Sequence, residues 1–551
     1  MFPLRHLLPL AAVLVAAGTA LVATAGGQAP PPALEVAPPA VHPGLRVGAS
    51  GTLELEVPGE APLPLVTRAG TWTLEQARGN PRGTARGLAF DFGRPDFRGT
   101  LVFGLVPYHD TRHPQPVFRA SVPIVDGKAE IDILATLNER YDMVGWRAAG
   151  TGVLGYRVLA ANGVVVHDGR VRFAGPGPFA VAETLVEGPF VANVTHQSAV
   201  IWFELDRPAP CEVRIGQRVV TCRAGERRQE LLVDRLAPAT AYRYSVHYGP
   251  HVEHYGFTTA PAPGTRRPFV FAYGSDSRAG QGGGDRNATG PNAYIVRRLM
   301  ALAMDRRAAF VQFTGDLVSG YAATPEALAL ELANWKRAIE PQAHWLPVYT
   351  GMGNHDTVVM EFTAPGRRRV RLDRFPFDGE SSEAVFAAAL VNPENGPASE
   401  DGSAWDPDPA RVDFPTYRRN VFWYRHDNVA IVVLNSNYWY APSHAQWPAA
   451  GGNLHGYLMD NQVAWLSRTL ATLQRDATLD HVFLTVHTPL FPNGGHVGDA
   501  MWYDGDNRPR PSVAGQPVAE GIIERRDAIL RLIQAHSKVV AVLAGDEHNY
   551  N

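Results

Sequence analysis

Five short segments of the chain each place Asp, Asn or His directly after an apolar run. One such residue after a strand is ordinary turn chemistry, whereas an ordered set of five indicates a site. Carboxylate, amide and imidazole groups together suit ions such as Mn, Fe or Zn. Two ions joined by a bridging carboxylate generate hydroxide and bind both oxygens of an in-line displacement at phosphorus. The segments are GSDSR with Asp276 and Arg278, TGDLVSGY with Asp316, TGMGNHD with Asn354, His355 and Asp356, TVHTPL with His487, and AGDEH with Asp546 and His548.

The apolar runs before these segments are typical of buried strands, and helical patterns separate several of them. Such alternation predicts an α/β domain with a largely buried sheet. Open α/β sheets place their sites at the carboxyl ends of the strands, so we expect the five segments to converge on one edge. The expected strands cover 268–274, 308–315, 345–351, 429–437, 481–487 and 538–545, and the expected helices cover 293–305, 325–340, 461–476 and 525–537.

The rest of the chain indicates two further domains rich in β-structure. A length of 551 residues suits about three domains. Alternating runs between turn signals predict a β-sandwich over 45–185 and a second sandwich over 186–263, with the α/β domain over 264–551. Tyr242 and Tyr244 follow a Leu-x-Pro turn, as in the tyrosine corner of immunoglobulin-type sandwiches. A net charge of −3 gives no indication of a nucleic-acid polymer as partner, and the sequence does not specify an oligomeric state.

The N-terminus has the features of a secretory signal peptide. Over 1–25, Arg5 and His6 precede an apolar run that ends in the small-residue site Ala23-Thr24-Ala25. An uncleaved membrane anchor is the alternative. A Pro-rich linker follows over 26–44. We expect no membrane span in the mature chain, which would be secreted, either extracellular or periplasmic.

The two cysteines of the chain are expected to form a disulfide. A two-residue hairpin loop at Gly216-Gln217 places Cys211 opposite Cys222. An oxidising compartment favours the bond, and two packed free thiols are the alternative.

The ordered set DSR, GD, GNHD, VHTP and GDEH resembles the calcineurin-like metallophosphoesterase superfamily. The stretch LAPATAYRYSV and the exit YGFTTAP resemble the arrangement of purple acid phosphatases, in which a fibronectin-like or immunoglobulin-like domain precedes the metallophosphoesterase domain. The resemblance covers the chain from about residue 187 and leaves out the first β domain. It implies all-β sandwich domains followed by an α/β metallophosphoesterase domain, a β-sheet sandwich flanked by helices. Members of the superfamily continue with further strands after the last histidine, so we expect a fragment or a domain without its edge.

The resemblance also implies a role for each residue of the set. Asp276 and His548 would bind the first of two metal ions, and Asp316 would bridge both ions. The second ion would be bound by Asn354, His487 and Asp546. His355 would contact the phosphate or protonate the leaving oxygen, with Asp356 orienting it.

The sequence departs from the superfamily pattern at three positions. Arg278 stands where a histidine is usual, and guanidinium does not ligate metals. It would either fork onto a phosphate oxygen or form a salt bridge to Asp316 or Asp546. Ser319 stands where purple acid phosphatases have their tyrosine, so we expect no tyrosinate-to-iron colour. Asp546 replaces an imidazole, which adds Mg and Ca to Fe, Mn and Zn as candidate ions. We treat Arg278 and Asp546 as linked changes, as a hypothesis.

The sequence therefore predicts a secreted phosphoesterase that uses a metal-bridging hydroxide on phosphomonoesters or small phosphodiesters. His496 and Asn437 are weaker candidates for substrate contact, with an exposed loop position and packing as the respective alternatives. One rival hypothesis is a degenerate, non-catalytic extracellular binding or scaffold module, and another is a single-metal enzyme. The retained ligand types argue against decay, because the altered position exchanges one ligand for a carboxylate.

Overall fold

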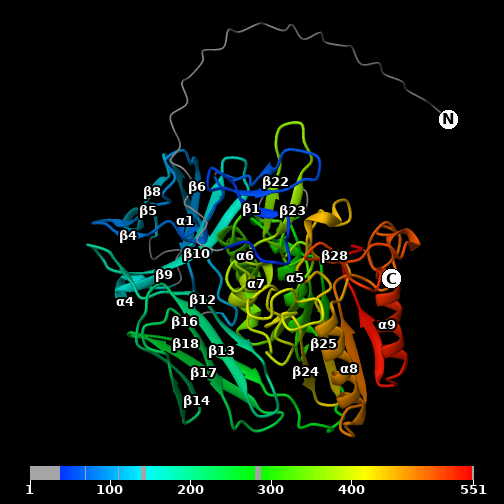
Figure 1. Cartoon of the computed structure of the whole chain (residues 1–551). Helices are drawn as coiled ribbons and strands as arrows, with labels where there is room; N and C mark the ends of the chain where they lie inside the picture. Colours follow the sequence, from blue (N-terminus) through cyan, green and yellow to red (C-terminus); the bar gives the residue numbers. More distant parts are fainter. Residues whose placement is uncertain (1–36, 69, 109–110, 138–143, 280–286, 549–551) are drawn as a thin grey trace, which may run out of the picture.

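A computed structural model describes residues 37–548 except residues 69, 109–110, 138–143 and 280–286. The expected signal peptide and most of the Pro-rich linker lie outside the described residues. None of the helices in this part of the chain combines the length and apolar character needed to span a bilayer. The chain is mostly β-structure in many small sheets. Figure 1 shows the two β domains on one side and the domain with α8 and α9 on the other.

The first β domain packs a five-stranded sheet, in the order β11-β10-β9-β6-β7, over a three-stranded sheet, β4-β5-β8. Its core is aromatic and aliphatic, with Phe90, Phe103, Trp146 and Phe173 among its buried members. The strands are β4 (Arg82–Gly83), β5 (Gly87–Asp91), β6 (Gly99–Leu105), β7 (Val117–Ile124), β8 (Lys128–Asp132), β9 (Thr151–Ala160), β10 (Val165–Ala174) and β11 (Ala180–Ala182), and the helices are α1 (Leu74–Arg78), α2 (Ile133–Thr136) and α4 (Trp146–Ala149).

The second β domain has the sheet orders β12-β13-β16 and β15-β14-β17-β18. These three- and four-stranded sheets have the strand count of a constant-type immunoglobulin sandwich. The backbone N–H of Ala237 donates to the Tyr242 hydroxyl over 2.8 Å, which ties the turn to its strand as a tyrosine corner does. The strands are β12 (Leu185–Ala192), β13 (Ala199–Leu205), β14 (Cys211–Ile215), β15 (Arg218–Thr221), β16 (Arg228–Val233), β17 (Ala241–Tyr248) and β18 (His251–Thr258).

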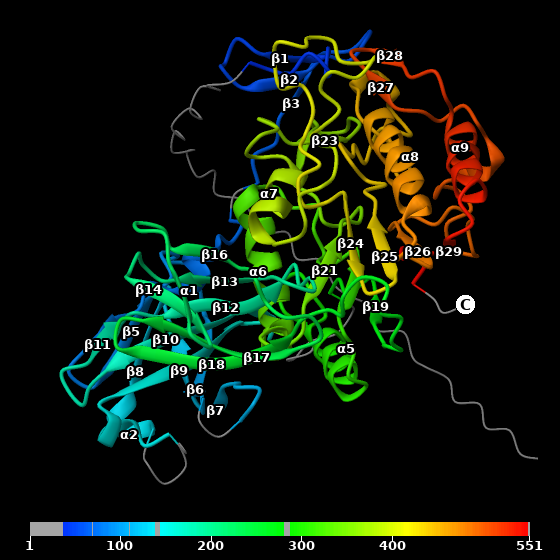
Figure 2. The ribbon, with the colours of Figure 1, turned by 90° about the horizontal axis from the view of Figure 1, so that it is seen from below.

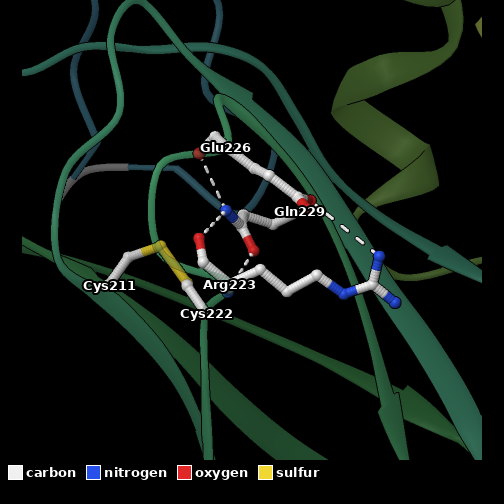
Figure 3. Close-up of a disulfide and its surroundings, with 5 residues drawn as sticks. All are labelled: Cys211, Cys222, Arg223, Glu226 and Gln229. Carbon is white, nitrogen blue, oxygen red and sulfur yellow. Dashed lines mark hydrogen bonds and ion pairs between the residues drawn. A yellow bond between two sulfur atoms is a disulfide. The ribbon is translucent and has the colours of Figure 1, made fainter.

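The predicted disulfide between Cys211 and Cys222 is present at the open end of the β14–β15 hairpin (Figure 3). Ile215 pairs with Arg218 across the two-residue turn, and the Cα atoms of the cysteines lie 5.3 Å apart. Beyond the bond, the buried Gln229 side chain donates to the carbonyl oxygens of Arg223 and Glu226 over 2.9 Å each. The disulfide and Gln229 together hold this loop against the sandwich.

The three short strands before the first β domain lie on the C-terminal domain. They are β1 (Leu45–Val47), β2 (Leu53–Leu55) and β3 (Leu63–Pro64). Leu53, Leu55 and Leu63 belong to the same core as Phe362 of β22, and Leu65 pairs with Phe362 as an isolated bridge. Figure 2 shows this sheet beside β23, β27 and β28, apart from β4 to β11. Residues 45–65, grouped by sequence with the first β domain, therefore pack with the α/β domain.

The C-terminal domain contains the strands and helices that the hydrophobic pattern predicts. Two of its helices begin at capping residues: the side chains of Asn292 and Thr324 accept hydrogen bonds from the first turns of α5 and α6. The elements are β19 (Ala272–Gly274), α5 (Ala293–Asp305), β20 (Val311–Thr314), α6 (Pro325–Ala343), β21 (Val348–Gly351), β22 (Val359–Phe362), β23 (Val370–Asp373), α7 (Ser382–Ala389), β24 (Phe422–His426), β25 (Val429–Val433), η1 (Pro448–Ala450), α8 (Asp460–Arg475), β26 (His481–Thr485), η2 (Tyr503–Gly505), β27 (Ser512–Val513), β28 (Gln516–Pro517), α9 (Ile522–Gln534) and β29 (Val539–Leu543).

Two sheets lie face to face between helices in this domain. The parallel sheet β19-β20-β21 packs against α5 and α6, and the sheet β24-β25-β26-β29 packs against α8 and α9. Aromatic side chains fill the space between the sheets, with Tyr349 stacked on Tyr424 at a centroid distance of 3.7 Å. In the second sheet, β25, β26 and β29 are parallel to one another. Parallel order within each sheet places the carboxyl ends of its strands at one edge.

Candidate metal centre

Each predicted ligand lies within a few residues of the end of a strand. Asp276 follows β19, Asp316 follows β20, Asn354 follows β21, and His487 and Asp546 follow β26 and β29. Asp276, Asp316, Asp546 and His548 have φ values of 58°, 53°, 72° and 54°, in the left-handed region that non-glycine residues seldom adopt. Backbone strain of this kind concentrates at functional sites.

Two glycines next to the ligands allow the strand ends to approach closely. A Cβ atom on Gly353 would lie 2.4 Å from Oδ1 of Asp316. A Cβ atom on Gly545 would lie 1.8 Å from the Ser275 hydroxyl and 2.6 Å from Oδ2 of Asp276. Gly353 of TGMGNHD and Gly545 of AGDEH are therefore required for the close packing of the strand ends at the site.

Asp276, Asp316 and His548 form one group. Each offers a ligand atom, and these atoms all lie within 4.8 Å of one another. Nε2 of His548 lies 3.4 Å from Oδ1 of Asp276. The backbone N–H of Asp546 donates to Oδ2 of Asp276 over 2.9 Å, so it joins the last strand end to the first.

His487 lies between this group and Asp546. Its Nε2 atom is 3.2 Å from Oδ1 of Asp316 and 3.7 Å from Oδ1 of Asp546. Its Nδ1 atom lies 3.0 Å from the carbonyl oxygen of Thr314, which fixes the ring so that Nε2 faces the carboxylates. Asn354 donates through Nδ2 to the Tyr321 hydroxyl over 2.8 Å, which leaves its Oδ1 atom free to accept.

The electrostatics of the site favour a positive charge among the carboxylates. Burial alone would lower the pKa of His487, but Asp316 first, and then Asp276 and Asp546, raise it well above its usual value. Burial would raise the pKa of Asp316, but His487 beside it holds that pKa below its usual value. A site that stabilises a buried imidazolium in this way also stabilises a cation at the same place.

The residues present fit a metal centre. Three buried atoms of the set make no hydrogen bond of good geometry within the described part of the chain: Oδ1 of Asp276, Oδ1 of Asn354 and Nε2 of His487. The first and the last have only the looser ion-pair contacts with His548 and Asp316. Buried polar atoms normally have partners. A carboxylate oxygen, an amide oxygen and an imidazole nitrogen in this state are the donor set of a borderline-to-hard cation.

His355 is oriented by the backbone. Its Nδ1 atom lies 2.6 Å from the carbonyl oxygen of Ser319, and its Nε2 atom lies 4.0 Å from Oδ2 of Asp316. The carboxylate of Asp356, to which the sequence assigned the orienting role, accepts the backbone N–H groups of Leu317 and Gly353 over 2.9 Å each. The carboxylate of Asp356 therefore holds the backbone of the loops around His355, while the Ser319 carbonyl orients the imidazole ring.

Arg278 lies at the exposed side of the centre. Its Nε atom is 3.9 Å from Oδ2 of Asp316, and its side chain is 37% exposed. Its Nη2 atom is 3.5 Å from Nε2 of His548. The ion pair to Asp316 is long, and more than a third of the Arg278 side chain is exposed.

The weaker candidates differ in their exposure. His496 is partly exposed, and its Nδ1 atom lies 3.0 Å from Asp499 and 4.0 Å from Oδ2 of Asp546. Asn437 is fully buried, beside Ser436 and Thr488. Full burial is expected of a packed amide, but the Oδ1 atom of Asn437 has no hydrogen-bond partner among the described residues.

Sequence reasoning missed His455. Its Nε2 atom lies 2.9 Å from Oδ2 of Asp546, and both side chains are buried. Burial would raise the pKa of Asp546, but His455 first, and then His487 and His496, lower it. Three imidazoles thus surround the carboxylate that replaces an imidazole. His455 lies 91 residues before its partner, and a lone histidine in GNLHGYL carries no local signal of this contact.

Known structures of similar fold include phosphatases. A scan of protein-family models and a search of curated proteins find no match. The structure named PhoD is similar at 15% identity and a TM-score of 0.40, over 65% of this chain and 71% of that one. The purple acid phosphatase PPD1 from yellow lupin (Lupinus luteus) seeds is similar at 14% identity and a TM-score of 0.42, over 83% and 76%.

A dimetal phosphatase from Danio rerio is similar at 15% identity and a TM-score of 0.29, over 51% of this chain and 82% of that one. The chain therefore has structural similarity to enzymes of phosphoesterase fold, at low identity. These three TM-scores are all below 0.5, so the side chains of the centre carry the functional argument.

Proposed function

We propose that this chain is a secreted, metal-dependent phosphoesterase that hydrolyses phosphomonoesters or small phosphodiesters. The observation that carries the proposal is the convergence of ligand atoms from separate strand ends on one centre. Asp276, Asp316 and His548 offer atoms within 4.8 Å of one another, and His487 lies 3.2 Å from the shared Asp316. The buried Oδ1 atoms of Asp276 and Asn354 accept no hydrogen bond from the described residues.

The residues divide into two ligand groups around Asp316. Asp276, Asp316 and His548 would hold one ion, and Asp316, Asn354, His487 and Asp546 would hold a second. When bound, such ions supply a hydroxide nucleophile near neutral pH and neutralise charge on the phosphate. The carboxylate of Asp546 is a harder ligand than an imidazole. It therefore favours Mn or Fe, and also Mg or Ca, as the bound ion over Zn.

Other side chains of the chain would act on the substrate. Arg278 would bind a phosphate oxygen through its partly exposed guanidinium, whose planar fork of N–H groups suits phosphate. His355 would protonate the leaving oxygen through Nε2, because its Nδ1 proton is engaged by the Ser319 carbonyl. His496 is partly exposed, and its Nδ1 atom lies 4.0 Å from Oδ2 of Asp546. It would contact the substrate beside Asp546.

The proposed location rests on two features. A signal peptide over 1–25 would direct export, and the Cys211–Cys222 disulfide suits an oxidising compartment. The three proposed domains are a first β domain within 45–185, whose residues 45–65 pack on the last domain, a second β domain over 186–263 and a metallophosphoesterase-like domain over 264–551.

The test is to measure metals per chain and turnover of nitrophenyl phosphate mono- and diesters for wild type and Asp316→Asn. We expect bound metal in the wild type and the loss of both turnover and part of the metal in the variant. The matched control is Asp305→Asn, an exposed carboxylate at the end of α5, which should change neither. If the wild type binds no metal and shows no Asp316-dependent turnover, the result supports the non-catalytic alternative.

A further inference from the structure

The ring of His355 depends on the position of one turn. Ser319 provides the carbonyl oxygen that lies 2.6 Å from Nδ1 of His355. This contact directs Nε2 toward the centre, 4.0 Å from Oδ2 of Asp316. A displaced Ser319 would therefore rotate the imidazole away from the leaving oxygen.

The Ser319 turn is held by the carbonyl oxygen of Gly290. The backbone N–H of Ser319 donates to this oxygen over 3.0 Å, and the Ser319 hydroxyl donates to it over 3.0 Å. The backbone N–H of Ala279, the neighbour of Arg278, also donates to it over 2.7 Å. One carbonyl oxygen thus joins the segment that carries Arg278 to the turn that orients His355.

Gly290 is packed too closely to move freely. Its φ is 101°, and a Cβ atom at this position would lie 2.6 Å from Cβ of Glu331 on α6. Glu331 also accepts the backbone N–H of Gly320 over 2.8 Å. The α6 helix therefore supports the turn from one side.

The first β domain supports the same turn from the other side. Residues Val165 and Val166 at the start of β10 present their carbonyl oxygens to Thr289 and to Asn334 of α6. Thr289 donates to Val165 through its backbone N–H over 2.7 Å and through its hydroxyl over 3.1 Å. Asn334 donates to the carbonyl oxygens of Val166 and Thr289 over 2.9 Å each.

His167 completes the connection. Its Nδ1 atom lies 2.9 Å from Oδ1 of Asn334, and both side chains are buried. The amide of Asn334 is thereby held in one orientation, with both of its N–H donors assigned. Buried polar networks in which every member is satisfied are rigid and specify one arrangement.

We infer that the first β domain positions the proposed active site, through Asn334 and Thr289 acting on the Gly290–Ser319 contact and hence on His355 and Arg278. This inference rests on the proposed function for its chemistry. Asn334 and Thr289 are positioning residues, since their contacts are to backbone and to His167. Misplacement of a reacting group by about 1 Å can cost about 100-fold in rate.

The competing explanation is that the contact only packs one domain against another. A packing contact affects stability and lowers all activities in proportion to the folded fraction. A positioning contact lowers mainly the reactions that need a proton from His355. Leaving-group dependence therefore separates the two explanations.

The test compares Asn334→Leu with wild type on nitrophenyl phosphate and glycerol phosphate. The nitrophenolate leaves without protonation, whereas the alkoxide of glycerol requires a proton. We expect Asn334→Leu to lower kcat on glycerol phosphate at least about tenfold more than on nitrophenyl phosphate, within the range of general-acid contributions. Metals per chain should be unchanged. The matched control is Tyr244→Phe, which removes a buried hydrogen bond of 2.9 Å from the second β domain to His344 beside α6 and should leave the ratio of the two rates unchanged.

A second readout does not depend on activity. Hydrogen–deuterium exchange should become faster in Asn334→Leu for peptides that contain Thr289 and Ser319, and should be unchanged there in Tyr244→Phe. If Asn334→Leu does not fold, Thr289→Val removes only the hydroxyl donor and should shift both readouts in the same direction by a smaller amount.

Two outcomes would overturn the inference: equal losses on the two substrates, or unchanged exchange around Thr289 and Ser319. A wild-type chain that hydrolyses neither of these monoesters nor a nitrophenyl phosphate diester would instead refute the proposed function. In that case faster exchange at Ser319 would still support the structural coupling, and unchanged exchange would refute it.

Discussion

His455 gives the sharpest test of the second ligand group. Substitution His455→Phe removes the hydrogen bond of 2.9 Å to Oδ2 of Asp546. Loss of a hydrogen bond to a metal-ligating group typically weakens metal binding about 10- to 100-fold, which corresponds to about 1.4 to 2.8 kcal/mol. Hydrogen bonds to charged groups contribute about 1.5 to 3 kcal/mol, so the two expectations agree.

The assay is a titration of the metal-free protein with Mn²⁺, followed by calorimetry or by the electron paramagnetic resonance signal of free Mn²⁺. We expect His455→Phe to weaken the step that involves Asp546 and to leave the step that involves Asp276 and His548 near its wild-type affinity. His455→Gln keeps an N–H donor of similar reach and should restore part of the affinity.

The matched control is His42→Phe. His42, in the segment before β1, is another buried imidazole that packs on the C-terminal domain, and its Nδ1 atom lies 3.0 Å from the carbonyl oxygen of Ala450. This variant should lose stability without losing metal affinity. Equal loss of affinity in the control, or an unchanged titration of His455→Phe, would refute the reasoning.

Three further predictions concern the substrate, pH and the disulfide. Arg278→Ala should lower kcat/KM for phosphomonoesters about 10- to 100-fold without loss of metal, and Arg278→Lys should restore only part of it. Burial raises the pKa of Glu383 well above its usual value and that of Asp373 to about 7, so the folded pair retains protons that the unfolded chain releases. The free energy of unfolding should therefore fall as pH rises from about 4 through 7. Urea unfolding at pH 5 and 8 should show a smaller fall for Glu383→Gln than for wild type, and an equal fall would contradict this prediction. Replacing Cys211 and Cys222 by Ser should lower the free energy of unfolding by about 3 kcal/mol, from loop-closure entropy, measured as a lower Tm; an unchanged Tm would contradict it.

The α/β pattern and the order of the ligand set were predictable from sequence for a physical reason. Fully buried strands such as β20 and β25 are continuous apolar runs. Parallel strands of one sheet end at the same edge, and the two face-to-face sheets of this domain end together: His487 after β26 lies 3.2 Å from Asp316 after β20. The disulfide was predictable because a two-residue turn at Gly216 fixes the register of its hairpin.

Contacts between distant segments were not predictable in the same way. His455 lies in a loop, and only the packing of the whole domain brings it to Asp546. Residues 45–65 have the alternation of any sandwich strand, and their apolar face does not specify which core it joins. The connection of Thr289 to Val165 likewise runs to a backbone carbonyl oxygen, which leaves no mark in the sequence.

Arg278 and Asp546 stand at two positions where the resemblance expects histidine, and their surroundings bear on the hypothesis that the two changes are linked. Arg278 lies beside Asp316, at 3.9 Å, and beside His548, at 3.5 Å. Asp546 lies among the imidazoles of His455, His487 and His496, at 2.9, 3.7 and 4.0 Å. The charge gained at Asp546 is therefore balanced by neighbours other than Arg278.

A double-mutant cycle on metal affinity decides the question. Because Arg278 and Asp546 have separate partners, we expect Arg278→His and Asp546→His to change the affinity for Mn²⁺ additively, within about 0.5 kcal/mol. Changes that share a network couple by about 0.5 to 3 kcal/mol. A coupling energy above about 1 kcal/mol would show that the charge at one position changes the effect of the other on metal affinity through Asp316. That result would support the hypothesis that the two changes are linked. Additivity would mean that the imidazoles of His455, His487 and His496 stabilise the carboxylate of Asp546, and that Arg278 is available to bind the substrate.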